Sequence, residues 1–222
     1  IVKVGARPVF VDCDLVTRNM DLAATAAAIT SATRAIMPTH FGAPLDLAGL
    51  RKLGRAMLTR LSAASGNLEI TFPYFIRKHA PVSGVASLLD YQAGLGIRMA
   101  ADGRTQVTVT LTAPVTSLCP CSKKISDYGA HNQRSHITVT ADVDVGELTF
   151  EELARVAEEE ASCAVYGLLK RPDEKWVTER AYDNPKFVED LVRDIALRMQ
   201  RDPRVGRFTV ASENFESIHN HS

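Results

Sequence analysis

The clearest constraint on the fold is a set of segments in which apolar and polar residues alternate. The run 107–111 alternates Val or Leu with Thr, and the run 137–145 shows the same period of two. Side chains of a strand point to opposite faces in turn, so this pattern predicts strands with one buried face. Residues 87–99, joined to the first run by the turn Ala101-Asp102-Gly103, are expected to form a hairpin with it.

Two helices are expected after these strands. The first begins at a capping box, Thr149-Phe150-Glu151-Glu152, and the second has Asn184 at its cap and Pro185 in its first turn. Strands are also expected at 68–72 and 207–215. This order predicts an α+β fold, an antiparallel sheet with helices on one face. The residues expected on the apolar helix faces are Leu153, Val156, Ala157, Ala161, Ala164 and Leu168 in the first helix, and Val188, Leu191, Val192, Ile195 and Met199 in the second.

The first 54 residues differ from the rest in composition. They contain no Glu and are rich in Ala. Their pattern predicts a strand at 8–12, a helix at about 21–29, a buried strand at 34–38 and another helix from Asp46. This is an α/β crossover unit, which cannot close a domain by itself. We therefore expect a boundary that separates an N-terminal fragment, 1–54, from a main region, 55–222.

Charge and hydropathy exclude several functional classes. Lys+Arg and Asp+Glu both total 26, so the formal net charge is zero. A basic surplus, typical of proteins that bind nucleic acid or anionic membranes, is missing. No apolar run approaches the roughly 20 residues of a membrane span. The first residues resemble neither a signal nor a transit peptide, so we expect a soluble, cytoplasmic protein.

The densest group of reactive side chains is expected in a long loop between two strands, at about 117–136. It contains Cys119, Cys121, His131 and His136, and thiols and imidazoles are standard zinc ligands. The spacing does not fit a structural zinc site with four ligands. A catalytic site, which needs three protein ligands and an open position for water, fits better. An exposed loop with incidental Cys and His is the alternative.

Other polar residues could complete a site. The charged segment 171–180 is either functional or a solvated loop between helices, and the segment 213–221 carries two Glu and two His. Glu189 borders the apolar face of the second helix, where most carboxylates are simply solvated. A partly buried Glu there could accept paired N–H donors from a purine edge. On charge grounds alone, three basic residues could contact phosphate: Lys123, Lys124 and Arg134.

Residues 66–222 resemble the GTP cyclohydrolases of type IB, a prokaryotic family distinct in sequence from the common type I enzyme. The resemblance implies a tunnelling fold, in which ββααββ modules surround a central channel and active sites lie at subunit interfaces. It implies GTP as partner in a homo-oligomer, a dimer or a tetramer. It also implies hydrolysis of GTP to 7,8-dihydroneopterin triphosphate and formate, the first step of tetrahydrofolate biosynthesis. The segments that carry it are 72–75, 80–84, 116–121, 125–136, 169–174, 177–185 and 213–221.

The resemblance also implies a divalent metal, zinc or manganese, with iron as a further option. Carried onto matching positions, Cys119, His131 and Glu174 correspond to its ligands, which leave one position for water. Glu189 corresponds to the carboxylate that binds the guanine edge. Three residues are implied near the reacting centre: Cys121 beside the metal, and Glu216 and His219 as acid–base groups.

Residues 8–14, 28–30, 33–36 and 40–44 resemble a middle slice of DegT-type sugar aminotransferases. The Asp and Lys that bind pyridoxal phosphate in that fold are not included, so no pyridoxal phosphate is expected. The opening strands of the cyclohydrolase module are expected to be missing as well. Two alternatives follow: an inactive fusion or truncation remnant that binds metal without turnover, and a related tunnelling-fold enzyme acting on another pterin or purine.

Overall fold

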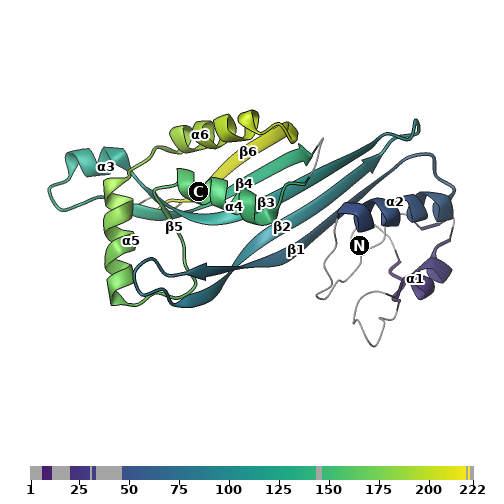
Figure 1. The fold of residues 1–222 in the computed structure, drawn as a ribbon, viewed down its shortest axis with the longest axis horizontal. Coiled ribbons are helices and arrows are strands. Elements are labelled where there is room, and N and C mark those ends of the chain that lie inside the picture. Colours follow the sequence, from purple (N-terminus) through teal and green to yellow (C-terminus); the bar gives the residue numbers. More distant parts are fainter. Residues whose placement is uncertain are drawn as a thin grey trace. The chain divides into compact units, whose positions relative to one another are not determined.

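A computed structural model describes residues 7–11, 21–30, 32–33, 47–143, 147–218 and 220. It has the predicted α+β class, with six strands in one antiparallel sheet ordered β1-β2-β3-β4-β6 and with β5 paired to β3 (Figure 1). The strands are β1 (Gly66–His79), β2 (Ala86–Met99), β3 (Thr105–Leu118), β4 (Asn132–Val143), β5 (Cys163–Ala164) and β6 (Val205–Phe215). The helices are α1 (Leu22–Ala28), α2 (Leu47–Leu61), α3 (Pro120–Ile125), α4 (Phe150–Glu160), α5 (Arg171–Asp183) and α6 (Val188–Arg201).

The chain divides into two compact units. The smaller consists of residues 1–68 and 97–105, and the larger of residues 69–96 and 106–222. In the smaller unit α2 packs on the end of β2 through Gly54, where a Cβ atom would lie 2.8 Å from the sulfur of Met99. Among the helices that the structure describes, none is both long and apolar enough to cross a membrane.

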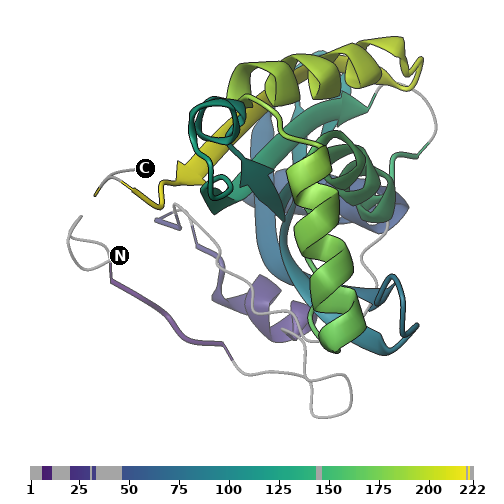
Figure 2. The same ribbon diagram turned by 90° about the vertical axis from the view of Figure 1, so that its left-hand side faces the viewer.

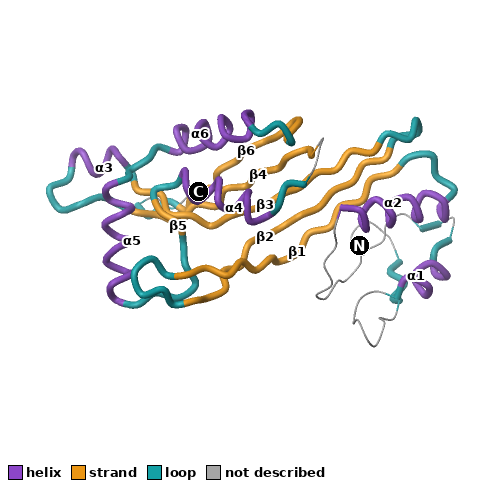
Figure 3. The backbone as a smooth tube through the Cα atoms, in the orientation of Figure 1, coloured by secondary structure: helices purple, strands orange, loops and turns teal. Residues whose placement is uncertain are grey.

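The two faces of the sheet in the larger unit differ in polarity. The odd-numbered residues from 107 to 117 of β3 and from 135 to 143 of β4 are buried, and Leu111 lies opposite Val139 in the antiparallel register. The opposite face carries a short ladder of threonines, in which hydroxyls pair at 3.1 Å between Thr110 and Thr140 and at 2.9 Å between Thr112 and Thr138. Helices α4 and α6 cover the apolar face (Figures 2 and 3). The predicted period of two thus sets which face carries the core.

The helices after β4 differ from the two predicted. The capping box at Thr149 is confirmed, but α4 ends at Glu160. Beyond it, Ala164 pairs with Val115 of β3, and Leu168 is half exposed; these residues and Ala161 were wrongly placed on the helix. Backbone hydrogen bonds to β3 are available at this point, so the chain leaves the helix for a short strand.

The charged segment expected as an interhelical loop is also a helix, α5. Its only buried residues are Asp173 and Ala181, so it lacks the apolar stripe by which a helix is recognised in a sequence. Asn184 ends α5 rather than beginning α6, because its backbone N–H donates to the carbonyl of Arg180. Phe187 is the N-cap residue of α6.

The expected N-terminal crossover unit is described only in part. Helices α1 and α2 lie close to the predicted positions, whereas residues 8–11 form no regular secondary structure. The predicted strand at 34–38 lies outside the described residues. In the main region β1 continues through Pro73 to His79, which an edge strand tolerates because the proline nitrogen needs no ladder partner.

Asp173 joins the β1–β2 turn to the start of α5. Its carboxylate is fully buried and accepts hydrogen bonds from the backbone N–H groups of Val82 (2.9 Å), Ser83 (2.8 Å) and Lys170 (2.9 Å), and from the Ser83 hydroxyl (2.6 Å). Burial alone would raise the pKa of Asp173, but these hydrogen bonds hold that pKa well below its ordinary value. The ionised form therefore holds this end of α5 in place.

We expect Asp173→Asn to destabilise the fold, and to do so less in acid. The carboxyl pKa is depressed in the folded state, so its stabilising effect is complete above the unfolded pKa of about 3.9 and fades as pH falls below it. Urea unfolding between about pH 7 and about pH 3 should show the gap to wild type narrowing. Asp183→Asn, at the exposed far end of α5, should leave stability unchanged throughout. A gap that stays constant with pH would contradict this role.

Candidate functional site

Cys119 and His131 are held together by the hydroxyl of Ser122. This hydroxyl donates to the carbonyl of Cys119 (3.0 Å) and accepts from the backbone N–H of His131 (3.1 Å). The Cys119 backbone N–H donates to the carbonyl of His131 (3.3 Å), so the two segments are paired directly as well. The expected long loop is thus shorter than predicted: Cys119 is the N-cap of α3, with Pro120 as its first residue, and β4 begins at Asn132.

The imidazole of His131 faces the segment that follows β6. Its Nδ1 atom lies 3.1 Å from the Ser217 hydroxyl and 3.5 Å from a carboxylate oxygen of Glu216. The same oxygen of Glu216 accepts a hydrogen bond from the Ser217 backbone N–H (2.9 Å). Contacts at Nδ1 fix the ring orientation, and among the described residues Nε2 makes no hydrogen bond or ion pair.

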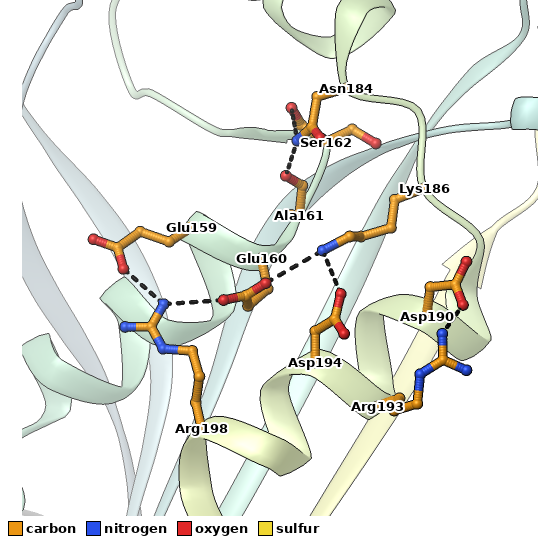
Figure 4. Close-up of polar contacts among 10 residues, drawn as sticks. All are labelled: Glu159, Glu160, Ala161, Ser162, Asn184, Lys186, Asp190, Arg193, Asp194 and Arg198. Carbon is orange, nitrogen blue, oxygen red and sulfur yellow. Dashed lines mark hydrogen bonds and ion pairs between the residues drawn. The ribbon is translucent and has the colours of Figure 1, made fainter. Parts of the chain in front are cut away.

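The residue before Cys119 is fixed on both sides of its backbone. The N–H of Leu118 donates to the buried hydroxyl of Ser162 (3.1 Å), and its carbonyl accepts from the N–H of Lys186 (3.2 Å). The Asn184 amide donates to the carbonyls of Ala161 (2.9 Å) and Ser162 (3.2 Å) (Figure 4). The end of α4 and the connection from α5 to α6 therefore hold Cys119 in place from two directions.

A network of ion pairs supports this connection. The ammonium of Lys186 lies between carboxylates of Glu160 (3.2 Å) and Asp194 (2.9 Å), and Arg198 contacts both Glu159 and Glu160 (Figure 4). The hydrogen bond from Lys186 is the main reason why the pKa of Asp194 lies below its ordinary value. The side chains of Lys186, Glu160 and Arg198 are partly buried, and together these ion pairs fix how α4, the α5–α6 connection and α6 meet.

The basic residues of the predicted site differ in availability. The ammonium of Lys123 donates to the carbonyl of Tyr182 and lies 4.0 Å from the centre of its ring, so it joins α3 to the end of α5. Lys124 and Cys121 are exposed on α3. Arg134 is exposed on β4, where its backbone pairs with Thr116 and Phe215.

Glu174 does not join this group within one chain. It lies in the first turn of α5, where it pairs with Arg171 at 2.7 Å. Tyr182, which contacts Lys123, is eight residues further along the helix, about 12 Å away at ~1.5 Å per residue. Figure 1 shows α3 at the other end of α5. Within the described ranges, no three His, Cys, Asp or Glu side chains are close enough to hold a metal ion.

The two remaining predicted residues lie elsewhere. Glu189 is exposed in the first turn of α6. His219 lies outside the described residues. In chemical terms, one thiol and one imidazole fit a zinc-type centre that lacks its remaining ligands. Of the predicted ligand set, Cys119 and His131 are the two residues whose backbones are paired with each other within one chain.

Comparison with known proteins identifies the family of this chain. The family model described as type I GTP cyclohydrolase folE2 matches residues 8–222. This chain belongs to that family. GTP cyclohydrolase FolE2 1 of Dechloromonas aromatica is 66% identical over 179 residues, which is 81% of this chain and 67% of that protein. GTP cyclohydrolase FolE2 2 of Cupriavidus metallidurans is 64% identical over 180 residues, again 81% and 67%. The chain spans about two thirds of the length of these relatives.

The family match corrects the interpretation of the N-terminal segment. It begins at residue 8 and therefore includes the stretches that resembled a DegT-type aminotransferase. The assignment of residues 1–54 to an aminotransferase fragment was wrong. Short strand–helix patterns rich in Ala and Val recur in unrelated α/β and α+β folds, so a few such segments carry little specificity.

Sequence reasoning missed the residues that position Cys119. Ser122 could have been found from the local sequence. It stands three residues after Cys119, the spacing at which an N-cap side chain accepts a hydrogen bond from a backbone N–H of the first helical turn. Ser162, Lys186 and Ser217 carried none, since they reach the site through contacts between residues far apart in the chain.

We expect Ser162→Ala to destabilise the protein by about 1–3 kcal/mol, because it leaves the buried N–H of Leu118 without an acceptor. The matched control is Ser87→Ala. The Ser87 hydroxyl is buried and, in the part of the chain that the structure describes, has no hydrogen-bond partner, so its removal should cost nothing or stabilise. Urea unfolding of both variants measures the difference. Equal stability of the two would show that Ser162 does not hold Leu118.

Proposed function

We propose that this chain catalyses the metal-dependent hydrolysis of GTP to 7,8-dihydroneopterin triphosphate and formate, the first step of tetrahydrofolate biosynthesis. The observation that carries the proposal is the match of residues 8–222 to the FolE2 family. The six-stranded antiparallel sheet with helices on its apolar face is compatible with a tunnelling fold, which we also propose. A cytoplasmic location is part of the proposal.

Cys119 and His131 are the proposed metal ligands from one chain. When bound, zinc, manganese or iron would supply a water of lowered pKa for attack on C8 of the purine. Ser217 and Glu216 orient His131 through Nδ1, so Nε2 would be the atom that binds the metal. Cys121 is exposed on the adjacent turn, and we place it beside the metal rather than on it.

The remaining roles follow from position and charge. Glu189 is proposed to accept the N–H groups of the guanine edge, and Lys124 and Arg134 to contact the triphosphate. Lys123 supports such a role less well, because its ammonium is held by Tyr182. Glu216 and His219 are the proposed proton-transfer groups, and the position of Glu216 beside His131 favours this.

We propose that Glu174 completes the metal site from a second copy of the chain. Glu174 lies about 12 Å along α5 from Tyr182, the residue that contacts α3, which argues against ligation within one chain. A homo-oligomer, dimer or tetramer, would bring the two surfaces together. This arrangement places the active site at a subunit interface.

We expect Cys119→Ala to abolish both metal binding and formate release. The thiolate is one of few protein ligands, so its loss removes the metal and the water that the metal activates. Elemental analysis and formate release from GTP, with added zinc or manganese, measure the two effects. Cys121→Ser should retain the metal. Wild-type chain that binds metal without turning over GTP would favour the alternative, an inactive remnant.

Mixing two inactive variants tests the origin of Glu174. Oligomers assembled from equal amounts of Cys119→Ala and Glu174→Gln chains should recover about a quarter of wild-type activity. About half of randomly formed dimers contain one chain of each kind, and each such dimer has one intact site of two. The matched control mixes Cys119→Ala with His131→Ala, two lesions in the same half-site, and should recover nothing. If the first mixture forms mixed oligomers but stays inactive, Glu174 does not act across the interface.

A further inference from the structure

A pocket lies between α4, β5 and α5, and its lining includes Ser162, which holds the backbone of Leu118. Its volume is about 280 Å³, and its wall includes Arg155, Glu158 and Glu159 from α4 and Trp176 and Arg180 from α5. Cys163 and Tyr166 line it between these helices. None of these seven side chains has a role in the proposed reaction.

The two carboxylates of this pocket are already neutralised. Glu158 accepts hydrogen bonds from the ammonium of Lys78 (2.7 Å) and from the hydroxyl of Tyr91. Glu159 is paired with Arg198 at 2.7 Å, on the side of α4 that faces α6 (Figure 4). Neither acid is left to balance a charge inside the pocket.

The two arginines have no such partner. Within the described part of the chain, neither Arg155 nor Arg180 makes an ion pair or a side-chain hydrogen bond. The nearby thiol does not offset them, because burial raises the pKa of Cys163 and keeps it protonated. The pocket thus holds two uncompensated guanidinium groups, one on each helix.

We propose that this pocket binds a phosphate-bearing anion between Arg155 and Arg180. Guanidinium groups donate paired N–H bonds to phosphate oxygens, and two of them lining one pocket favour a multiply charged anion. The ring of Trp176, 38% exposed, provides a flat apolar wall for whatever the phosphate carries. This ligand site goes beyond the proposed function and does not depend on it.

Trp176 makes the proposal directly testable, because it is the only tryptophan of the sequence. Titration of the wild-type protein with inorganic pyrophosphate, at constant ionic strength, should give a saturable change in tryptophan fluorescence. Arg155→Ala and Arg180→Ala should each weaken the apparent affinity by about tenfold or more, the usual effect of removing a hydrogen bond between charged groups. Both side chains are exposed, so the variants should fold normally.

Lys175→Ala is the matched control, since it removes a positive charge beside Trp176 from the same helix but outside the pocket. It should bind pyrophosphate as wild type does. A missing saturable change, or equal weakening in all three variants, would overturn the proposal.

The KM for GTP identifies the source of the phosphate. If the two arginine substitutions raise KM in parallel with their loss of pyrophosphate binding, the pocket receives the triphosphate of the substrate. If KM stays the same, the pocket takes a separate phosphate-bearing ligand. Either result supports the pocket as a phosphate site, and the fluorescence titration remains readable even in protein that does not turn over GTP.

Discussion

The position of Cys119 depends on how the backbone of Leu118 is held. Leu118 ends β3, and its N–H and carbonyl point to different elements, Ser162 after α4 and Lys186 before α6. An unpaired backbone group at this buried point would cost free energy, so both bonds are strongly favoured. Because the next residue is Cys119, the contacts of Leu118 with Ser162 and Lys186 also set the position of the Cys119 backbone.

The same arrangement explains why one sheet can carry both a core and a site. The odd-numbered residues from 107 to 117 of β3 and from 135 to 143 of β4 are buried under α4 and α6, whereas the opposite face carries the threonine ladder. Polar groups can therefore gather at the strand ends without interrupting the core. The site lies at this border. Strand β3 ends and strand β4 begins there, and the backbone N–H of Cys119 donates to the carbonyl of His131.

The parts of the fold that follow from local pattern could be read from the sequence. The period of two located β3 and β4, the capping box located α4, and the thiols and imidazoles located the loop with Cys119 and His131. The predictions that failed concern features set by contacts between residues far apart in the chain. Helix α5 buries only Asp173 and Ala181, so its apolar pattern is too weak to see, and α4 ends early because β3 offers backbone partners to Ala164. The aminotransferase resemblance failed because it rested on short stretches without a defining site.

Helix α5 separates the two halves of the proposed metal site. Its first turn is fixed to the β1–β2 turn by Asp173, and its last turn to α3 by the contact of Lys123 with Tyr182. A helix held at both ends cannot swing Glu174 toward Cys119 without breaking a buried, ionised hydrogen-bond network, which is costly. The rigidity that orders each half thus favours assembly of the proposed site between copies, so that forming the oligomer and forming the catalytic centre would be the same event.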